Sequence, residues 1–210
     1  MKKLVITAWI LFCFASDSYA LPIISTFDSD DEGWTATGAS VQHESSGGNP
    51  GGFLRIEDTQ DDTFSVYLPA KFQGNLLEFD GGLLSYDVLV LNPIDPLTSI
   101  GSGFGRIQLH GGGSNTTIDY APTPPIPSSQ FWKAYNVPLT ASAWNTTQEN
   151  WELVLSDMTI AHIILEPNNW TTVGLDNFKV EPVVPEPATL SLLSFGLLGL
   201  TIRRKISRQR

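Results

Sequence analysis

The amino-acid sequence predicts an all-β domain, a two-sheet β-sandwich with one short helix. Three observations favour this fold class. Short segments rich in β-branched and aromatic residues follow one another along the chain. Clusters of glycine and proline separate these segments. A single segment has the apolar spacing of a helix.

The expected strands follow from periodicity. In residues 63–68, Phe64, Val66 and Leu68 share one face of an alternating segment. Residues 83–91 form a longer β-rich run, typical of a strand covered on both sides. Other strands are expected at 53–58, 106–110, 116–120, 132–139, 162–166 and 173–181. The separating glycine and proline clusters lie at 45–52, 81–82, 92–96, 111–113 and 122–127.

The expected helix lies near residue 150. Residues 146–149, Thr-Thr-Gln-Glu, have the sequence of a capping box. Behind them, Trp151, Val154, Leu155 and Met158 follow at helical spacing. We therefore expect one short helix whose apolar side packs on the sandwich.

Residues 1–20 have the pattern of a secretory signal peptide. Lys2 and Lys3 precede an apolar stretch at 4–15, and Ala20 ends a small-residue cleavage pattern. We expect cleavage after Ala20, which makes Leu21 the first mature residue. The only cysteine, Cys13, lies inside this segment, so the mature chain has no thiol and no disulfide.

The opposite end of the chain has three consecutive parts. Pro185, Glu186 and Pro187 form an extended peptide, because each proline fixes φ and lacks an N–H. Residues 188–202 carry no charge, and residues 203–210 contain five basic side chains that favour the cytoplasmic side. The uncharged run of 15 residues is shorter than the roughly 20 of a typical spanning helix. An ordinary C-terminal membrane anchor is the alternative interpretation.

This C-terminal segment, residues 183–210, resembles the PEP-CTERM sorting signal of exopolysaccharide-producing Gram-negative bacteria. The resemblance implies an exosortase as a partner, a membrane protease that cleaves near the Pro-Glu-Pro motif. It also implies a precursor anchored in the inner membrane by a transmembrane helix at 188–202. After export and cleavage, the protein is expected at the cell surface or in the extracellular matrix.

The charge of the remaining domain limits its partners. Between residues 21 and 184, 20 acidic side chains stand against 5 basic ones, a formal charge of −15. Binding to nucleic acid requires clustered Lys and Arg at phosphates, so nucleic acid is excluded as a partner. Strong negative charge favours cations and neutral polymers instead.

A second resemblance covers residues 21–182. The short motifs that carry it are Phe27-Asp28, Glu32-Gly33-Trp34, the segments 47–54, 70–75 and 81–87, and a final Gly-Leu-Asp-Asn-Phe at 174–178. In this order they resemble the laminin IV (laminin B) domain, itself similar to the galactose-binding-like jelly rolls of carbohydrate-binding modules. The resemblance implies a jelly-roll sandwich. The cysteine-rich repeats that flank this domain in laminins have no counterpart here, so laminin polymerisation is not implied.

The same resemblance implies a structural calcium ion, Ca2+, where the first strand, a glycine-rich loop and the last strand meet. Carried over residue by residue, it places Asp28 and Asp176 as side-chain ligands, with backbone carbonyls near Asn49. Carboxylate and carbonyl oxygens are the ligands that calcium prefers. The alternative is that these carboxylates belong to a solvated acidic surface.

Two tryptophans are candidates for glycan binding. Trp144 and Trp170 lie in polar, loop-like surroundings, where an exposed indole can stack on a sugar ring. Core packing is the alternative for both, and it is the expected role of Trp34 and Trp151.

No motif for catalysis stands out. The three histidines lie in unrelated segments, and neither a His-x-x-x-His spacing nor a Gly-x-Ser-x-Gly elbow is present. We therefore expect a non-catalytic, exported protein that binds glycan or matrix. The alternative is a secreted polysaccharide hydrolase with an unrecognised carboxylate pair.

Overall fold

The computed structural model describes residues 20–60, 62–92, 103–111, 113, 116–121, 127–168 and 170–183. Residues 1–19 of the expected signal peptide lie outside the described residues. So do the sorting motif at 185–187, the expected transmembrane helix at 188–202 and the basic tail at 203–210. Within the described ranges, no helix has the length and apolarity needed to cross a membrane.

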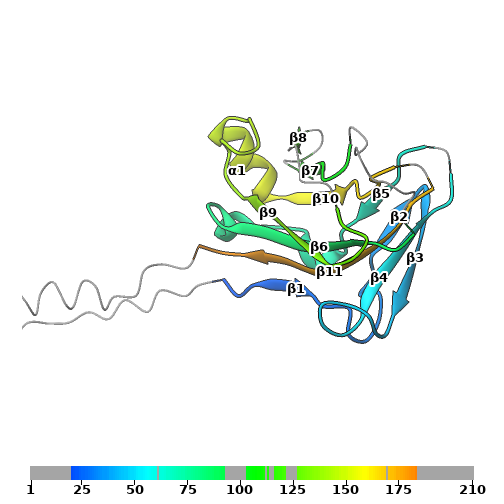
Figure 1. Ribbon diagram of the computed structural model, residues 1–210. Coiled ribbons are helices and arrows are strands. Elements are labelled where there is room, and N and C mark those ends of the chain that lie inside the picture. Colours follow the sequence, from blue (N-terminus) through cyan, green and yellow to red (C-terminus); the bar gives the residue numbers. More distant parts are fainter. Residues whose placement is uncertain are drawn as a thin grey trace, which may run out of the picture.

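Two antiparallel sheets face each other across the core (Figure 1). The first sheet has the order β3 (Ala39–Glu44), β4 (Phe53–Asp58), β11 (Thr172–Glu181), β6 (Leu83–Val90) and β9 (Lys133–Pro138), and β1 (Ile23–Ser25) also pairs with β11. The second sheet has the order β2 (Thr35–Thr37), β5 (Ser65–Tyr67), β10 (Met158–Ile163), β7 (Ile107–Gly111) and β8 (Thr116–Tyr120). The predicted all-β sandwich is therefore confirmed.

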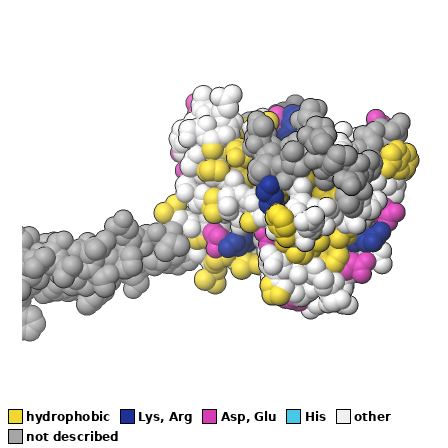
Figure 2. Space-filling model, viewed as in Figure 1, with side chains coloured by type: hydrophobic (Ala, Val, Ile, Leu, Met, Phe, Trp, Pro, Cys, Tyr) yellow, Lys and Arg dark blue, Asp and Glu magenta, His cyan; other side chains and the backbone are white. Residues whose placement is uncertain are grey.

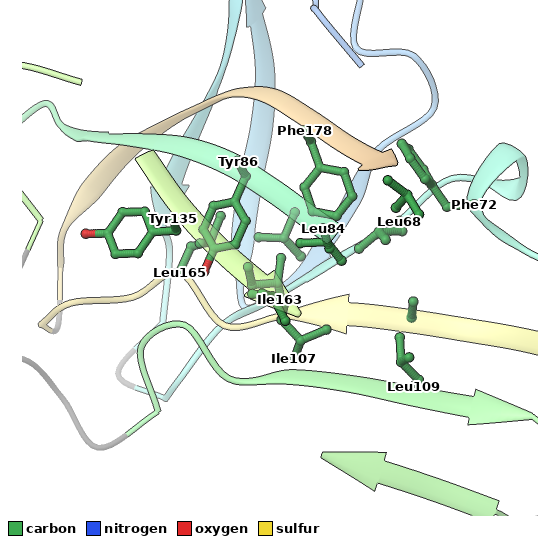
Figure 3. Close-up of a cluster of buried hydrophobic side chains, with 14 of the residues drawn as sticks. Leu68, Phe72, Leu84, Tyr86, Ile107, Leu109, Tyr135, Ile163, Leu165 and Phe178 are labelled. Atoms are coloured by element: carbon green, nitrogen blue, oxygen red, sulfur yellow. The ribbon is translucent and has the colours of Figure 1, made fainter. Parts of the chain in front are cut away.

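Large aromatic and branched side chains from both sheets fill the space between them (Figure 3). Tyr86 and Phe178 project from the first sheet toward Ile107 and Ile163 of the second. The Tyr86 ring stacks on Tyr135 with 5.3 Å between ring centroids. Close packing of this kind, together with the burial of apolar area, stabilises a domain that has no disulfide.

Helix α1 (Gln148–Ser156) begins one residue later than the capping box predicts. Its N-cap is Thr147, whose hydroxyl accepts a hydrogen bond of 3.2 Å from the backbone N–H of Asn150, so Glu149 has no capping role of the predicted kind. Trp151 is buried on the apolar face as expected. Met158 lies at the start of β10 instead, because the helix ends at Ser156.

The predicted strands agree with the structure to different degrees. The bounds of β8 are the predicted ones, whereas β10 begins at Met158, four residues before the predicted segment. Strands β1, β2 and β3 were not predicted. They are short or half-exposed, so their sequences lack a clear apolar alternation. The short 3-10 turns η1 (Ala70–Phe72) and η2 (Leu77–Phe79) lie between β5 and β6.

Candidate glycan and cation sites

The last strand, β11, changes its partner on one side near Asp176. It pairs with β4 as far as Leu175 and with β1 from Phe178 onward. The register against β6 also shifts between Asp176 and Lys179, and Asn177 has a φ of 49°. This irregularity places the Asp176 side chain where three strands meet, and the residue is fully buried.

The glycine-rich loop at residues 45–52 lies directly over this irregularity. The backbone N–H of Asn49 donates a hydrogen bond of 2.5 Å to Oδ2 of Asp176. The side-chain amide of Asn49 donates to Oδ2 of Asp87 at 3.1 Å, and that of Asn177 donates to the same oxygen at 2.9 Å. Asn177 also donates to the carbonyl oxygen of Asn49.

Two glycines allow this close approach. A Cβ at position 48 would lie 2.7 Å from Oδ2 of Asp176, closer than carbon and oxygen tolerate. A Cβ on Gly51 would collide with Oδ1 of Asp28, and the φ of Gly51 is 91°. Glycine is needed at position 48 because a Cβ there would also lie 2.1 Å from the carbonyl oxygen of Gly52, and at position 51 because the loop packs against Asp28 with a positive φ.

The structure thus brings together Asp28, Asn49 and Asp176, the residues of the predicted calcium site. It adds Asp87, which no sequence motif singles out. Burial raises the pKa of Asp176 to about 6, and the charges of Asp87 and Asp28 act in the same direction against the lowering effect of the two backbone N–H donors. In the ranges that the structure describes, no three acidic or histidine side chains converge in the arrangement of a metal centre.

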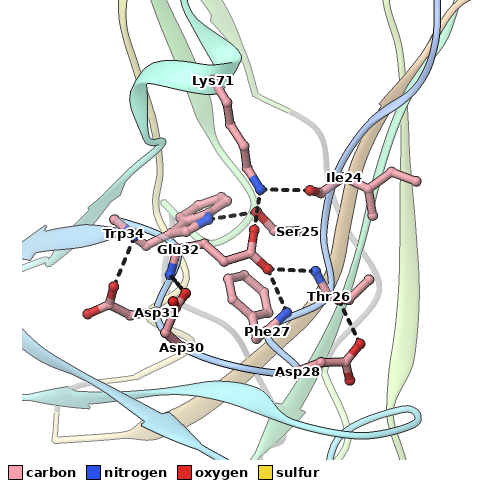
Figure 4. A network of polar contacts seen from close by, with 11 residues as sticks. Ile24, Ser25, Thr26, Phe27, Asp28, Asp30, Asp31, Glu32, Trp34 and Lys71 are labelled. Atoms are coloured by element: carbon pink, nitrogen blue, oxygen red, sulfur yellow. Dashed lines mark hydrogen bonds and ion pairs between the residues drawn. The ribbon is translucent and has the colours of Figure 1, made fainter.

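Asp28 is held in place by a network around Glu32 (Figure 4). One carboxylate oxygen of Glu32 accepts from the backbone N–H groups of Thr26 and Phe27, at 3.0 and 2.8 Å. The other forms an ion pair with Lys71, which also donates to the carbonyl of Ile24 at 2.7 Å. These contacts fix the backbone on either side of Phe27, whose φ is 54°, and so position the next residue, Asp28.

The two candidate tryptophans occupy different environments. Trp144 is only 2% exposed, its rings lie 5.4 Å from Tyr120 and 5.5 Å from Trp151, and its Nε1 donates to the carbonyl of Pro138 at 2.9 Å. It borders a cavity of about 630 Å3 next to β8, but its indole has no open face. Contrary to the prediction, Trp144 is therefore a core residue.

Trp170 has the exposure that stacking requires. The side chain is 56% exposed, and the backbone φ of 61° turns it out of the loop between β10 and β11. Its backbone N–H donates to Oδ2 of Asp58 at 2.6 Å, so the loop beneath the indole is anchored. An exposed indole on an anchored backbone is suited to stacking on a sugar.

Acidic side chains outnumber basic ones over the sandwich. Figure 2 shows few Lys or Arg side chains on the face in view, and most of these lie beside an acidic one. The ion pairs Arg55–Glu57, Arg106–Asp119 and Lys179–Glu181 account for three of the five basic residues between 21 and 184. A basic surface for an acidic polymer is therefore missing from the described part of the chain.

Comparisons with known proteins match two parts of the chain, the C-terminal motif and the β-sandwich. The PEP-CTERM protein-sorting motif matches residues 183–205. The structure is similar to the family 11 carbohydrate-binding module of cellulosomal cellulase Lic26A-Cel5E of Clostridium thermocellum. That likeness has a TM-score of 0.51 and 18% identity, over 81% of this chain and 99% of the module.

Two further likenesses concern an agarase and a laminin domain. The agarase AgWH50C is similar with a TM-score of 0.53 and 10% identity, over 79% of this chain but 26% of the agarase. The L4b domain of human laminin alpha-2 is similar with a TM-score of 0.49 and 16% identity, over 61% of this chain and 80% of that domain. No curated protein matches the chain. The chain therefore combines a jelly-roll β-sandwich, of the kind found in family 11 carbohydrate-binding modules, with a C-terminal PEP-CTERM sorting motif, the signal of an exosortase substrate.

Proposed function

We propose that this chain is an exported, non-catalytic glycan-binding protein, released by an exosortase to the cell surface or the exopolysaccharide matrix. The observation that carries the proposal is the pairing of a sorting motif with a sandwich that spans 99% of a carbohydrate-binding module. The sorting motif accounts for the export of this protein and for its release by an exosortase.

The charge of the domain supports a neutral glycan as the ligand. The formal charge of −15 between residues 21 and 184 repels acidic polymers. Sugar hydroxyls and the apolar faces of sugar rings suit exposed aromatic and amide side chains. Trp170, with its exposed indole, is proposed as one contact.

The surroundings of the clustered carboxylates support binding over catalysis. Hydrolysis of a glycosidic bond needs two carboxyl groups that reach the substrate from opposite sides. Asp176 is fully buried and accepts two backbone N–H groups, while Asp87 accepts from the amides of Asn49 and Asn177. Neither carboxyl is placed to protonate a leaving oxygen. The agarase likeness covers about a quarter of that enzyme and carries no argument for activity in this chain.

A calcium ion at the loop over β11 is part of the proposal. Burial raises the pKa of Asp176, and the charges of Asp87 and Asp28 add a repulsion that acts in the same direction. A divalent cation would turn the repulsion into attraction. Asp28, Asp176 and the carbonyl of Asn49 would supply its ligands.

The glycan proposal is tested on an array of neutral and acidic polysaccharides, with release of reducing sugar measured on the same polymers. Saturable binding to neutral glycans without sugar release is the expected result. Sugar release that persists after repeated purification would overturn the non-catalytic role, and an empty array would overturn glycan binding.

The sorting proposal is tested separately by intact-mass analysis of the secreted protein. We expect a chain that starts at Leu21 and ends near Pro185. Secreted protein that retains residues 202–210 would contradict cleavage by an exosortase.

A further inference from the structure

Five side chains from five strands form one row across the outer face of the second sheet. Their backbones are direct partners: Thr35 with Tyr67, Tyr67 with His162, His162 with Gln108, and Gln108 with Asp119. Buried residues flank the three central ones along their strands, so the row points away from the core. Four spacings of about 4.8 Å give the row a length of about 19 Å.

The middle of the row is a surface of planar rings. The Tyr67 ring lies 5.3 Å from the His162 ring, and the His110 ring lies 5.8 Å from it on the other side with an interplanar angle of 27°. His110 is held by a contact of 2.8 Å between its Nδ1 and the hydroxyl of Thr117. Beside it on β10, Ile160 is 45% exposed. Rings and an exposed aliphatic side chain suit the apolar face of a sugar.

One ring nitrogen of His162 makes no hydrogen bond within the described residues. The residue is 9% exposed, and none of the described residues provides a hydrogen-bond partner for its Nδ1. A buried polar atom without a partner costs about 1–3 kcal/mol. Because the atom itself is buried, a ligand on this face reaches it only if the surrounding side chains move.

The edges of the row are polar and electrically balanced. Arg106 forms an ion pair of 3.2 Å with Asp119, which cancels both charges. Gln108 is half-exposed between the rings and this pair. Burial and the neighbouring His110 lower the pKa of His162, so its ring is neutral near pH 7. The face therefore complements an uncharged partner, and its polar groups make it unlike an apolar protein interface.

We propose that this row, with His110 beside it, is the binding face for the neutral glycan, which lies across the strands with its sugar rings over Tyr67 and the two histidines. Gln108 and the Arg106–Asp119 pair then hydrogen-bond the sugar hydroxyls. The inference rests on the proposed function and adds a location to it. A groove of about 470 Å3 on the outer face of the first sheet, lined by Ser85 and Asn136 among others, is the competing place.

The test measures affinity of the exported protein for the neutral polysaccharide that binds best on the array. Tyr67→Ala and Gln108→Ala are compared with Asn136→Ala, which changes the opposite face. We expect at least a tenfold loss of affinity for the first two and unchanged affinity for the third. Gln108→Ala removes a half-exposed amide from the sheet surface, so it keeps the test valid if Tyr67→Ala lowers the melting temperature.

The outcomes separate the two claims. If the wild type binds and both second-sheet variants keep its affinity, this face is not the site, while glycan binding stands. A loss confined to Asn136→Ala would move the site to the first sheet and overturn the inference. If the wild type binds no glycan, the proposed function fails and the inference fails with it.

Discussion

The backbone N–H of Asn49 and the carboxylate of Asp176 are joined by a hydrogen bond of 2.5 Å, although 127 residues separate them in the sequence. The bond fastens the loop between β3 and β4 to the last strand. It also places a fully buried carboxyl group near Asp28 and Asp87. The pKa of Asp176 therefore depends on whether the loop and the last strand stay together at this end of the sandwich.

The first prediction concerns pH in the absence of calcium. The folded state keeps the proton of Asp176 up to a pKa of about 6, whereas the unfolded chain loses it near the ordinary aspartate pKa of 3.8. The proton-bound form therefore contributes stability below about pH 4, and this contribution disappears as pH rises through 6. From the size of the pKa shift, the loss is about 3 kcal/mol.

The variant Asp176→Asn removes this titration while keeping the shape of the side chain. We expect the free energy of unfolding of the variant to change less between pH 4 and pH 7 than that of the wild type. Urea titrations in a chelator at both pH values measure the difference. Equal pH dependence in the two proteins would show that Asp176 ionises normally in the folded state.

The second prediction concerns the calcium ion. Binding to the folded state alone stabilises by about 2.7 kcal/mol at a hundredfold excess of ligand over Kd. Millimolar calcium added to chelator-treated protein should raise the melting temperature by several degrees, beyond the effect of sodium chloride at equal ionic strength. Asp176→Ala should remove most of the increase, whereas Asp62→Ala, an exposed acid in a different loop, should retain it. Equal shifts with calcium and with matched salt would contradict the site.

The third prediction concerns Glu32. Partial burial opposes its ionisation, but the hydrogen bonds from Lys71 and the backbone of Phe27 outweigh burial, so its pKa is lowered. Glu32→Ala leaves the N–H groups of Thr26 and Phe27 without their acceptor, which should cost about 1–3 kcal/mol of unfolding free energy. Because the folded pKa is depressed, this contribution should fade as pH falls through that lowered pKa.

Glu57→Ala is the matched control for this change. It removes the exposed ion pair with Arg55, which is worth about 0–1 kcal/mol. Urea unfolding at pH 7 compares the two variants. A loss for Glu32→Ala no larger than that for Glu57→Ala would mean that the network does not hold the Phe27 backbone.

The fourth prediction separates the two tryptophans. Trp144→Ala empties a buried position and should lower the free energy of unfolding by about 3–5 kcal/mol. Trp170→Ala changes an exposed side chain and should alter stability by less than about 0.5 kcal/mol. Thermal unfolding measures both. We expect Trp170→Ala to weaken glycan binding; full affinity in this variant would remove Trp170 from the proposed contacts.

The sequence predicted the class of fold because its strongest patterns are local. Residues 116–120 alternate, and they form β8 with the predicted bounds. Met158 was assigned to the helix because its spacing from Trp151 fits a helical face, but the chain leaves the helix after Ser156 to enter β10. Three-residue strands such as β1 and β2 gain their stability from pairing with distant partners, so local periodicity does not reveal them.

The candidate sites depend on pairing between distant segments. Asp28, Asn49 and Asp176 were selected through a family resemblance, and the fold brings them to one end of the sandwich. Asp87 was missed because it lies inside a run that reads as a buried strand. The row from Thr35 to Asp119 requires the strand order β2-β5-β10-β7-β8, which no local pattern specifies. Trp144 looked exposed because its neighbours are polar, yet its ring packs on Trp151.

Affinity gel electrophoresis of the exported protein is the most direct measurement of glycan binding. The protein migrates through native gels with and without a neutral polysaccharide, next to a non-binding acidic protein of similar size. We expect the polysaccharide to slow this protein in proportion to the polysaccharide concentration and to leave the reference protein unchanged, with no shortening of the polymer. Equal mobility in every neutral polysaccharide, at calcium concentrations from zero to millimolar, would contradict a glycan-binding function.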